Sequence, residues 1–393
     1  MYQPFIIKLP KADVKNINLS KKTDNIITTP ILPYQLCSLG FHYFIKRTRE
    51  SMDITTKLQT TIPFYYVVNP FENIISNYED DINNSTKNYL KIKTDYNHEF
   101  HKMWETLFVF DLASTDILSS CILSNNKDTK DVITDVIDYL RQKTGKKNTK
   151  DQIVSSDKDM NLLKKNNCDL IIGHSKVESE NSMNNYCYLE QENYLEILKE
   201  IIHILKYQKE KGNAILQIYD VYTNVTIKLL YIISAFYDEV FVYKPFMSRP
   251  SDMDKYIILK GFKDNKELDN LIKILELCLS HVKKDEYITD LLLDFIVPKD
   301  YYNIFKFVNI KLANIQQNMI NNIIIYIREN DYFGDKFHDY KNKQIESSTW
   351  WITNFYPPSQ NLFEKNKDEL IKLYKTSQEK LNLENNKFLE NLM

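Results

Sequence analysis

Apolar runs of strand length alternate with amphipathic helical patterns through the middle of the chain, and this alternation constrains the fold most strongly. Three runs read as buried strands: ILSSCIL (117–123), CDLIIGH (168–174) and AILQIYD (214–220). A helical pattern follows each run, which predicts parallel strands joined by helical crossovers. Two more strands, EVFVYKP (239–245) and KYIILKGF (255–262), are separated by a segment too short for a helix. We therefore expect an α/β sheet, mostly parallel, with an antiparallel strand at its end.

The segments on either side of this pattern suggest three parts. Residues 1–95 are mixed, with an aromatic strand expected at 62–68, and form an amino-terminal extension. The α/β part covers 96–264 and begins with a helix over 96–112, in which Lys102 falls away from the apolar stripe and is expected in solvent. Residues 265–393 read as a helical appendage.

Glycine is scarce. It occurs six times, where average usage near ~7% would give about 27. No two glycines are closer than Gly145 and Gly173, so a GxGxxG or Walker A phosphate loop is excluded. Gly212 is expected to end the long helix that follows residues 168–174.

Cysteine usage and charge narrow the class of protein further. The five cysteines are an odd number, lie far apart and form no CxxC pair, which disfavours a disulfide framework and a zinc site. The net charge of -2 creates no global basic field, so any contact with RNA must be a local patch. No signal peptide or membrane span is evident, and we expect a soluble, intracellular protein.

Residues 213–262 resemble the last third of FtsJ-like RNA ribose 2′-O-methyltransferases, especially the mRNA cap enzymes of eukaryotes and large DNA viruses. The motifs Lys244-Pro245, Ser248-Arg249-Pro250 and Tyr256-Ile257 match that family in order and spacing. Upstream, HKMWETL and CDLIIGHSK resemble its first conserved helix and its Asp-Leu-Val strand. The resemblance implies a Rossmann-like methyltransferase fold, S-adenosylmethionine as cofactor and capped mRNA as partner.

The family's Lys-Asp-Lys-Glu tetrad maps onto Lys102, His174, Gln217 and Asp254. A 2′-hydroxyl needs a cationic group flanked by carboxylates before it becomes a nucleophile. A neutral amide at Gln217 cannot accept the proton or lower the hydroxyl pKa by charge. Asp254 keeps the carboxylate, and His174 is a candidate general base. Only the first of the four positions is identical, so we expect a degenerate catalytic site.

The cofactor loop is altered as well. The family has Ala-Glu-Gly-Pro-Gly-Ser-Phe after the first strand, whereas this chain has Ser124, Asn125, Asn126, Lys127 and Asp128. Glycines in this loop allow the backbone to approach the cofactor closely and to adopt positive φ, and this chain lacks them. We expect S-adenosylmethionine binding at Ser124, Asn125, Asn126 and Asp128 to be lost.

Several basic, aromatic and histidine residues are further candidates. Possible RNA contacts are Lys46, Arg47, Arg49, Lys244 and Arg249. For the first three the alternative is a solvated helix face, and for Arg249 it is a structural ion pair.

The histidine and tryptophan candidates each have a structural interpretation beside the functional one. His98 and His101 have the spacing of metal ligands but no third ligand, so we expect no metal. Trp350 and Trp351 either stack on a base or anchor the appendage.

Three functions remain open at this point. The favoured hypothesis is an inactive methyltransferase homologue that serves as an RNA- or protein-binding subunit of viral capping or RNA-processing machinery. The alternative is an active RNA 2′-O-methyltransferase in which His174 is the base and Asp254 its partner. A structural virion protein is the third. Capped RNA and capping or transcription proteins are the expected partners, in the host cytoplasm or the virion.

Overall fold

One large sheet forms the centre of the molecule. The computed structural model describes residues 5–17, 26–31, 68–75, 98–155, 167–175, 189–283, 285–329 and 335–355. Within them, seven strands form a sheet in the order β1-β7-β8-β6-β5-β3-β4, and β2 pairs with β9 in a separate two-stranded sheet. All but the last residue of the strand expected at 62–68, and the helix expected after Pro357-Pro358, lie outside the described residues.

The strand directions are those of a Rossmann-like methyltransferase sheet. The strands are β1 (Phe5–Lys8), β3 (Ser119–Leu123), β4 (Gln152–Val154), β5 (Cys168–Gly173), β6 (Gln208–Ile218), β7 (Tyr237–Lys244) and β8 (Lys255–Phe262). β4, β3, β5 and β6 are mutually parallel, while β8 runs antiparallel to both β6 and β7. The predicted α/β class is confirmed, and so is its antiparallel strand. That strand is not at the edge, however, because β8 lies between β6 and β7 and β1 pairs with the outer side of β7.

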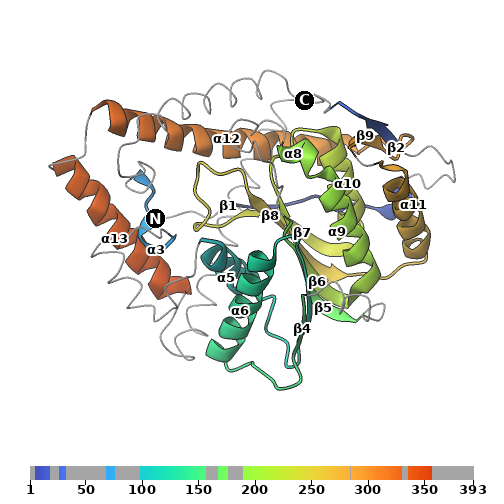
Figure 1. Cartoon of the computed structure of the whole chain (residues 1–393), viewed down its shortest axis with the longest axis horizontal. Coiled ribbons are helices and arrows are strands. Elements are labelled where there is room, and N and C mark those ends of the chain that lie inside the picture. Colours follow the sequence, from blue (N-terminus) through green and yellow to red (C-terminus); the bar gives the residue numbers. More distant parts are fainter. Residues whose placement is uncertain are drawn as a thin grey trace.

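Helices cover both faces of the sheet, as Figure 1 shows. On one side lie α5 (His98–Phe110) and α6 (Lys127–Lys143), and on the other lie α9 (Tyr194–Tyr207), α10 (Asn224–Ser234) and α11 (Leu268–His281). Alternating strand residues divide the core into two clusters. Leu170 and Ile172 of β5 pack with the α5 side, and Ile171 packs with the α9 side. The double covering explains why the strands read as continuous apolar runs.

The remaining elements lie around this core. They are η1 (Val14–Asn16), β2 (Ile26–Thr29), α3 (Glu72–Ile75), α8 (Leu189–Glu192), β9 (Tyr287–Leu291), α12 (Lys299–Arg328) and α13 (Asp335–Phe355). Trp351 and Phe355 of α13 are fully buried in the α5-side cluster. α12 is the longest described helix and runs along the top of the molecule in Figure 1. No described helix is long and apolar enough to cross a membrane.

Three details differ from the sequence-based expectation. Gly212 does not end a helix: α9 stops at Tyr207, and Gly212 lies inside β6, where an added Cβ would meet Lys209 O at 2.8 Å. β4 lies in the polar, lysine-rich link after α6, where its three exposed or half-buried residues give no apolar run. β9 interrupts the segment expected to be all helical, because it pairs with β2 from the far end of the chain.

Candidate functional site

The candidate catalytic residues gather where the parallel strands end. His174 directly follows β5, and Gln217 is the penultimate residue of β6. Gly173 is in register with Leu216, so His174 and Gln217 are neighbours on the same face. Asp254 immediately precedes β8, whose Tyr256 is paired with Gln217. Ligands of open α/β sheets bind at this carboxyl edge.

Lys102 reaches this edge from α5 and is not in solvent. Its residue is 2% exposed, and every residue of the helix after His98 is buried. Its Nζ lies 2.7 Å from Asp254 Oδ2 and 3.1 Å from Glu99 Oε1. The expected solvent position is therefore wrong. An amphipathic pattern identifies the apolar face of a helix as buried. It does not reveal whether tertiary contacts also bury the polar face.

Glu99 connects the two halves of the site, and the sequence reasoning did not single it out. Its Oε2 lies 3.0 Å from His174 Nε2, and Tyr256 Oη lies 3.5 Å from the same nitrogen. Glu99 and Lys102 have the i,i+3 spacing of a helical ion pair, which was the available signal. His174, Glu99, Lys102 and Asp254 thus form one continuous buried chain of polar contacts.

Opposite charges hold Glu99, Lys102 and Asp254 in their ionised forms. Burial alone would raise the pKa of Glu99, but Lys102 and His174 bring that pKa well below its usual range. Burial alone would lower the pKa of Lys102, and the carboxylates of Asp254 and Glu99 instead raise it well above its usual range. The pKa of Asp254 is likewise lowered by Lys102 and Lys244 against the effect of burial. Lys102 is therefore a fixed cation, neutralised on both sides.

Gln217 does not join the chain of contacts. It is 4% exposed, and its Oε1 has no hydrogen-bond partner among the described residues. Nδ1 of His174 is also buried without a partner in the described part of the chain. The structure therefore brings three of the four tetrad positions into one network and leaves the amide beside it.

The edge expected to hold the cofactor is closed by short contacts between β3 and β5. Ser124 Oγ donates to the backbone oxygen of His174 at 2.8 Å, and His174 N donates to Leu123 O at 2.8 Å. Asn126 caps α6, its Oδ1 accepting from Thr129 N at 3.0 Å.

The helix consequently begins at Lys127. Asp128 belongs to its first turn, and the intervening Asn125 is exposed.

A carboxyl group fills the other face of this edge. Glu200 of α9 accepts from Ser175 Oγ at 2.5 Å, and a Cβ added to Gly173 would meet its Oε2 at 2.7 Å. Burial raises the pKa of Glu200 to about 8. The order of parallel strands reverses between β3 and β5, which is where open α/β sheets bind ligands. Here the Ser124–His174 hydrogen bond joins the two strands, and the Glu200 carboxyl group occupies the other face. These residues do not fit S-adenosylmethionine in the manner of a glycine-lined crevice.

The candidate RNA-binding side chains are engaged inside the protein. Lys244 is buried, and its Nζ donates to Ser248 Oγ at 2.8 Å, Asp252 O at 2.9 Å and Asp254 O at 3.0 Å. Arg249 forms a fork with the carboxylate of buried Glu72, at 2.7–3.1 Å. The structural ion pair considered for Arg249 is therefore present.

Lys46, Arg47 and Arg49 lie outside the described residues. Their proposed contacts with RNA stay predictions.

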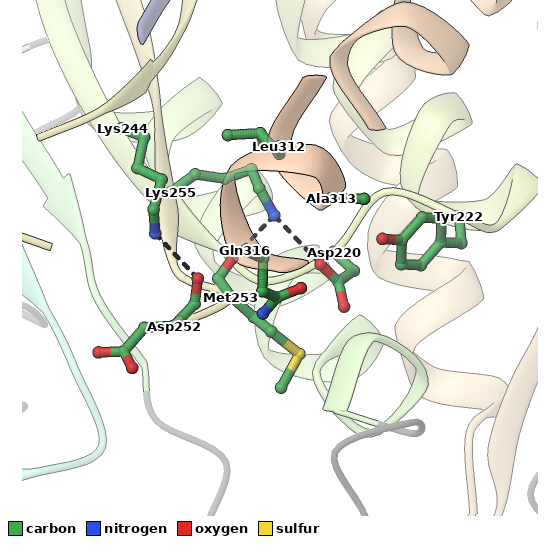
Figure 2. Close-up of a pocket in the computed structure, with 9 residues that line it drawn as sticks. All are labelled: Asp220, Tyr222, Lys244, Asp252, Met253, Lys255, Leu312, Ala313 and Gln316. Atoms are coloured by element: carbon green, nitrogen blue, oxygen red, sulfur yellow. Dashed lines mark hydrogen bonds and ion pairs between the residues drawn. The ribbon is translucent and has the colours of Figure 1, made fainter. Parts of the chain in front are cut away.

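A shallow cleft of about 250 Å³, part of it open solvent, lies beside Lys244 and beneath α12. Figure 2 shows the two lysines that line it turned toward protein oxygens. Lys255 Nζ donates to Met253 O at 2.8 Å and lies 3.5 Å from Asp220 Oδ1. Gln316 of α12 closes one side by donating to Ser251 O at 2.6 Å. The lysines fix the surrounding loops and present no spare cluster of positive charge.

The remaining candidates have structural environments. His101 is buried with its ring against Trp351, while His98 lies 3.4 Å from Glu99. The described residues contain no group of three or more side chains suited to hold a metal ion. Trp351 donates from Nε1 to Glu105 Oε2 at 2.9 Å, and half-buried Trp350 packs edge-on against Phe246. The tryptophan pair therefore anchors α13 to the core.

Sequence comparison finds partial relatives and no family model that matches. An uncharacterized protein of Acanthamoeba polyphaga mimivirus is 24% identical over 269 residues, covering 67% of each chain. The cap-specific mRNA (nucleoside-2′-O-)-methyltransferase 1 of Caenorhabditis elegans is 33% identical over 89 residues, 21% of this chain and 10% of that protein. An inactive cap-specific methyltransferase 1B of Caenorhabditis briggsae is 29% identical over 79 residues, 19% of this chain and 9% of that protein. The chain therefore spans about a tenth of the length of the cap methyltransferases that it matches.

Two solved structures overlap loosely with this chain. They are a Haemonchus contortus phosphoethanolamine N-methyltransferase 2 in complex with phosphomonomethylethanolamine and S-adenosylhomocysteine, and the spermidine synthase of Thermotoga maritima. The first is 13% identical and covers 42% of this chain and 38% of that one, and the second is 16% identical and covers 55% and 75%. Both have a TM-score of 0.24, so the fold assignment rests on strand order and direction. The chain has a Rossmann-like methyltransferase fold and shares a limited stretch of sequence with cap-specific mRNA 2′-O-methyltransferases.

Proposed function

We propose that this protein is a catalytically inactive homologue of the mRNA cap 2′-O-methyltransferases that acts as an RNA- or protein-binding subunit of viral capping or RNA-processing machinery. The observation that carries the proposal is the chain of contacts His174–Glu99–Lys102–Asp254. Each residue in it is at most 6% exposed. Gln217, at the position of the family's central lysine, stays outside this chain of contacts, and its neutral amide cannot activate a substrate hydroxyl by charge.

The cofactor edge supports the same proposal. The hydrogen bond from Ser124 to His174 O joins β3 to β5 where a nucleoside would have to enter. Glu200 occupies the opposite face, and the glycines that permit close approach are absent. One relative, from Caenorhabditis briggsae, is itself named an inactive cap-specific methyltransferase. A fold can be retained after its catalytic activity is lost.

Calorimetry with S-adenosylmethionine and S-adenosylhomocysteine tests the proposal. We expect no heat of binding for the wild-type chain, and none after Gln217→Lys, because the added amine leaves the β3–β5 edge closed. Binding by the wild-type protein with an affinity in the micromolar range would overturn the inactive assignment. Single-stranded and capped RNA, measured by fluorescence anisotropy, then test the binding role.

One observation favours a second candidate, an active methyltransferase. Glu99 holds Nε2 of His174 at 3.0 Å and leaves Nδ1 without a partner among the described residues, which is the arrangement of an oriented general base. The carboxylate that orients His174 is Glu99, whereas Asp254 had been expected in that role. This candidate requires cofactor binding, and it requires methyl transfer that is lost in His174→Ala and retained in the matched variant His101→Ala.

A further inference from the structure

The longest described helix carries an unusual polar face. Between Tyr301 and Arg328, α12 contains no aspartate or glutamate, but it contains six asparagines and two glutamines. Asparagine is a poor helix former, and alanine, lysine or glutamate at exposed positions would favour the helix more. Local stability therefore does not account for this composition.

The exposed amides form a stripe with a cation at each end. Asn314, Asn318 and Asn321 are exposed and recur at the spacing of one helix face. Lys306 and Arg328 are exposed near the two ends of that face. The stripe from Lys306 to Arg328 is about 33 Å long at 1.5 Å per residue.

The helix is fixed in place by its other side. Asn309 Nδ2 donates to Val221 O at 2.6 Å, and Gln316 donates to Ser251 O at 2.6 Å. These contacts tie α12 to the loop that follows β6 and to the loop that precedes β8, so the helix lies along the carboxyl edge of the sheet (Figure 1). A rigid helix presents its exposed side chains at low entropic cost to a partner.

We propose that the exposed face of α12, defined by Lys306, Asn314, Asn318, Asn321 and Arg328, binds single-stranded nucleic acid. Between Tyr301 and Arg328 no carboxylate of α12 repels phosphates, and the terminal cations attract them. Amide side chains both donate and accept hydrogen bonds, which suits bases and sugars that are not already paired. Lys306 also lies over the ring of Tyr302 at 5.2 Å, which holds its stem along the helix. This inference rests on the RNA-binding form of the proposed function and names the surface that performs it.

The test adds carboxylates to the stripe without disturbing the fold. Asn314→Glu, Asn318→Glu and Asn321→Glu are combined, since glutamate favours a helix more than asparagine does. The matched control places three glutamates on exposed positions of α13: Asn342→Glu, Thr349→Glu and Thr353→Glu. Circular dichroism establishes that both variants fold.

Fluorescence anisotropy with labelled 20-nucleotide RNA and DNA strands supplies the readout. We expect the α12 variant to bind at least tenfold more weakly and the α13 control to stay within twofold of wild type. Replacing Lys306 and Arg328 by glutamine should reduce the slope of log K against log salt by about 1.4, at ~0.7 per lost phosphate contact on a single strand. Comparison of the two strands shows whether the sugar is distinguished.

Three outcomes would overturn the inference. Equal RNA affinity in wild type and the α12 variant would place the RNA elsewhere and leave the proposed function intact. Loss of self-association in the α12 variant by light scattering, with RNA affinity unchanged, would make the face a protein interface. No binding of either strand by wild type would remove both this inference and the RNA-binding form of the proposed function, while calorimetry with the cofactor still tests the inactive assignment.

Discussion

Lys102 Nζ lies 2.7 Å from Asp254 Oδ2, and both residues are buried although 152 positions separate them in the chain. A pair of charges in such a place fixes α5 against the loop before β8. Its short distance and burial are those of an ion pair that stabilises the fold, whereas its two residues occupy positions of the family's catalytic tetrad.

Lys102→Met should lower the free energy of unfolding by roughly 3–5 kcal/mol, because it leaves Asp254 and Glu99 as buried carboxylates without their cation. Urea denaturation followed by circular dichroism measures the change. Lys147→Met is the control, since its pair with Asp138 is on the surface at 3.1 Å and should contribute less than about 1 kcal/mol. Equal effects in the two variants would contradict the buried tie.

Glu200 should make the protein less stable as pH rises. Burial raises the pKa of its folded-state carboxyl from 4.5 to about 8, so between these values the folded state binds a proton that the unfolded state has released. The free energy of unfolding should fall across this window, by at most about 1.4 kcal/mol per pH unit for one proton. Glu200→Gln should flatten the pH dependence in urea melts from pH 5 to 8. An unchanged slope would show that Glu200 is ionised when folded.

Arg249→Gln should destabilise the fold by about 2–4 kcal/mol, since Glu72 is 1% exposed and loses its fork of hydrogen bonds. Arg249→Gln with Glu72→Gln should recover much of that loss, because no unpaired carboxylate then stays buried. If Arg249 served chiefly to bind phosphate, the single variant would keep its stability and lose RNA affinity.

The two adjacent tryptophans should differ sharply when replaced. Trp351→Ala should cost about 3–5 kcal/mol, because the ring is 0% exposed and its Nε1 satisfies buried Glu105. Trp350→Ala should cost less, since that ring is half-buried. Chemical denaturation measures both. Matched losses in the two variants would mean that α13 is not anchored chiefly through Trp351.

The sequence alone predicted the middle strands of the large sheet and missed its edge strands and the separate pair of β2 and β9. β5 and β8 are buried on both faces, so their apolar runs marked them clearly. β4 is a short strand at the edge, and β9 depends on pairing with β2 across the chain, so neither carries a strong local pattern.

The same limit applies to the site. The family resemblance located Lys102, His174, Gln217 and Asp254, but the burial of Lys102 accompanies its contact with Asp254, which lies 152 positions away in the chain. Glu99 has no counterpart in the motif that was compared. Its role follows from the meeting of α5 with the end of β5, which only the tertiary structure supplies.

The pairing of β1 with β7 also bears on how the chain assembles during synthesis. Ile7 lies beside Val242, so the first described strand must wait for roughly 230 residues to be made before its partner exists. At 5–20 residues per second the wait is about 12–46 s, during which Phe5, Ile6 and Ile7 have no sheet to cover them. The nascent chain in that interval is a natural client for a chaperone, and completion of the sheet edge is a late event, set by translation.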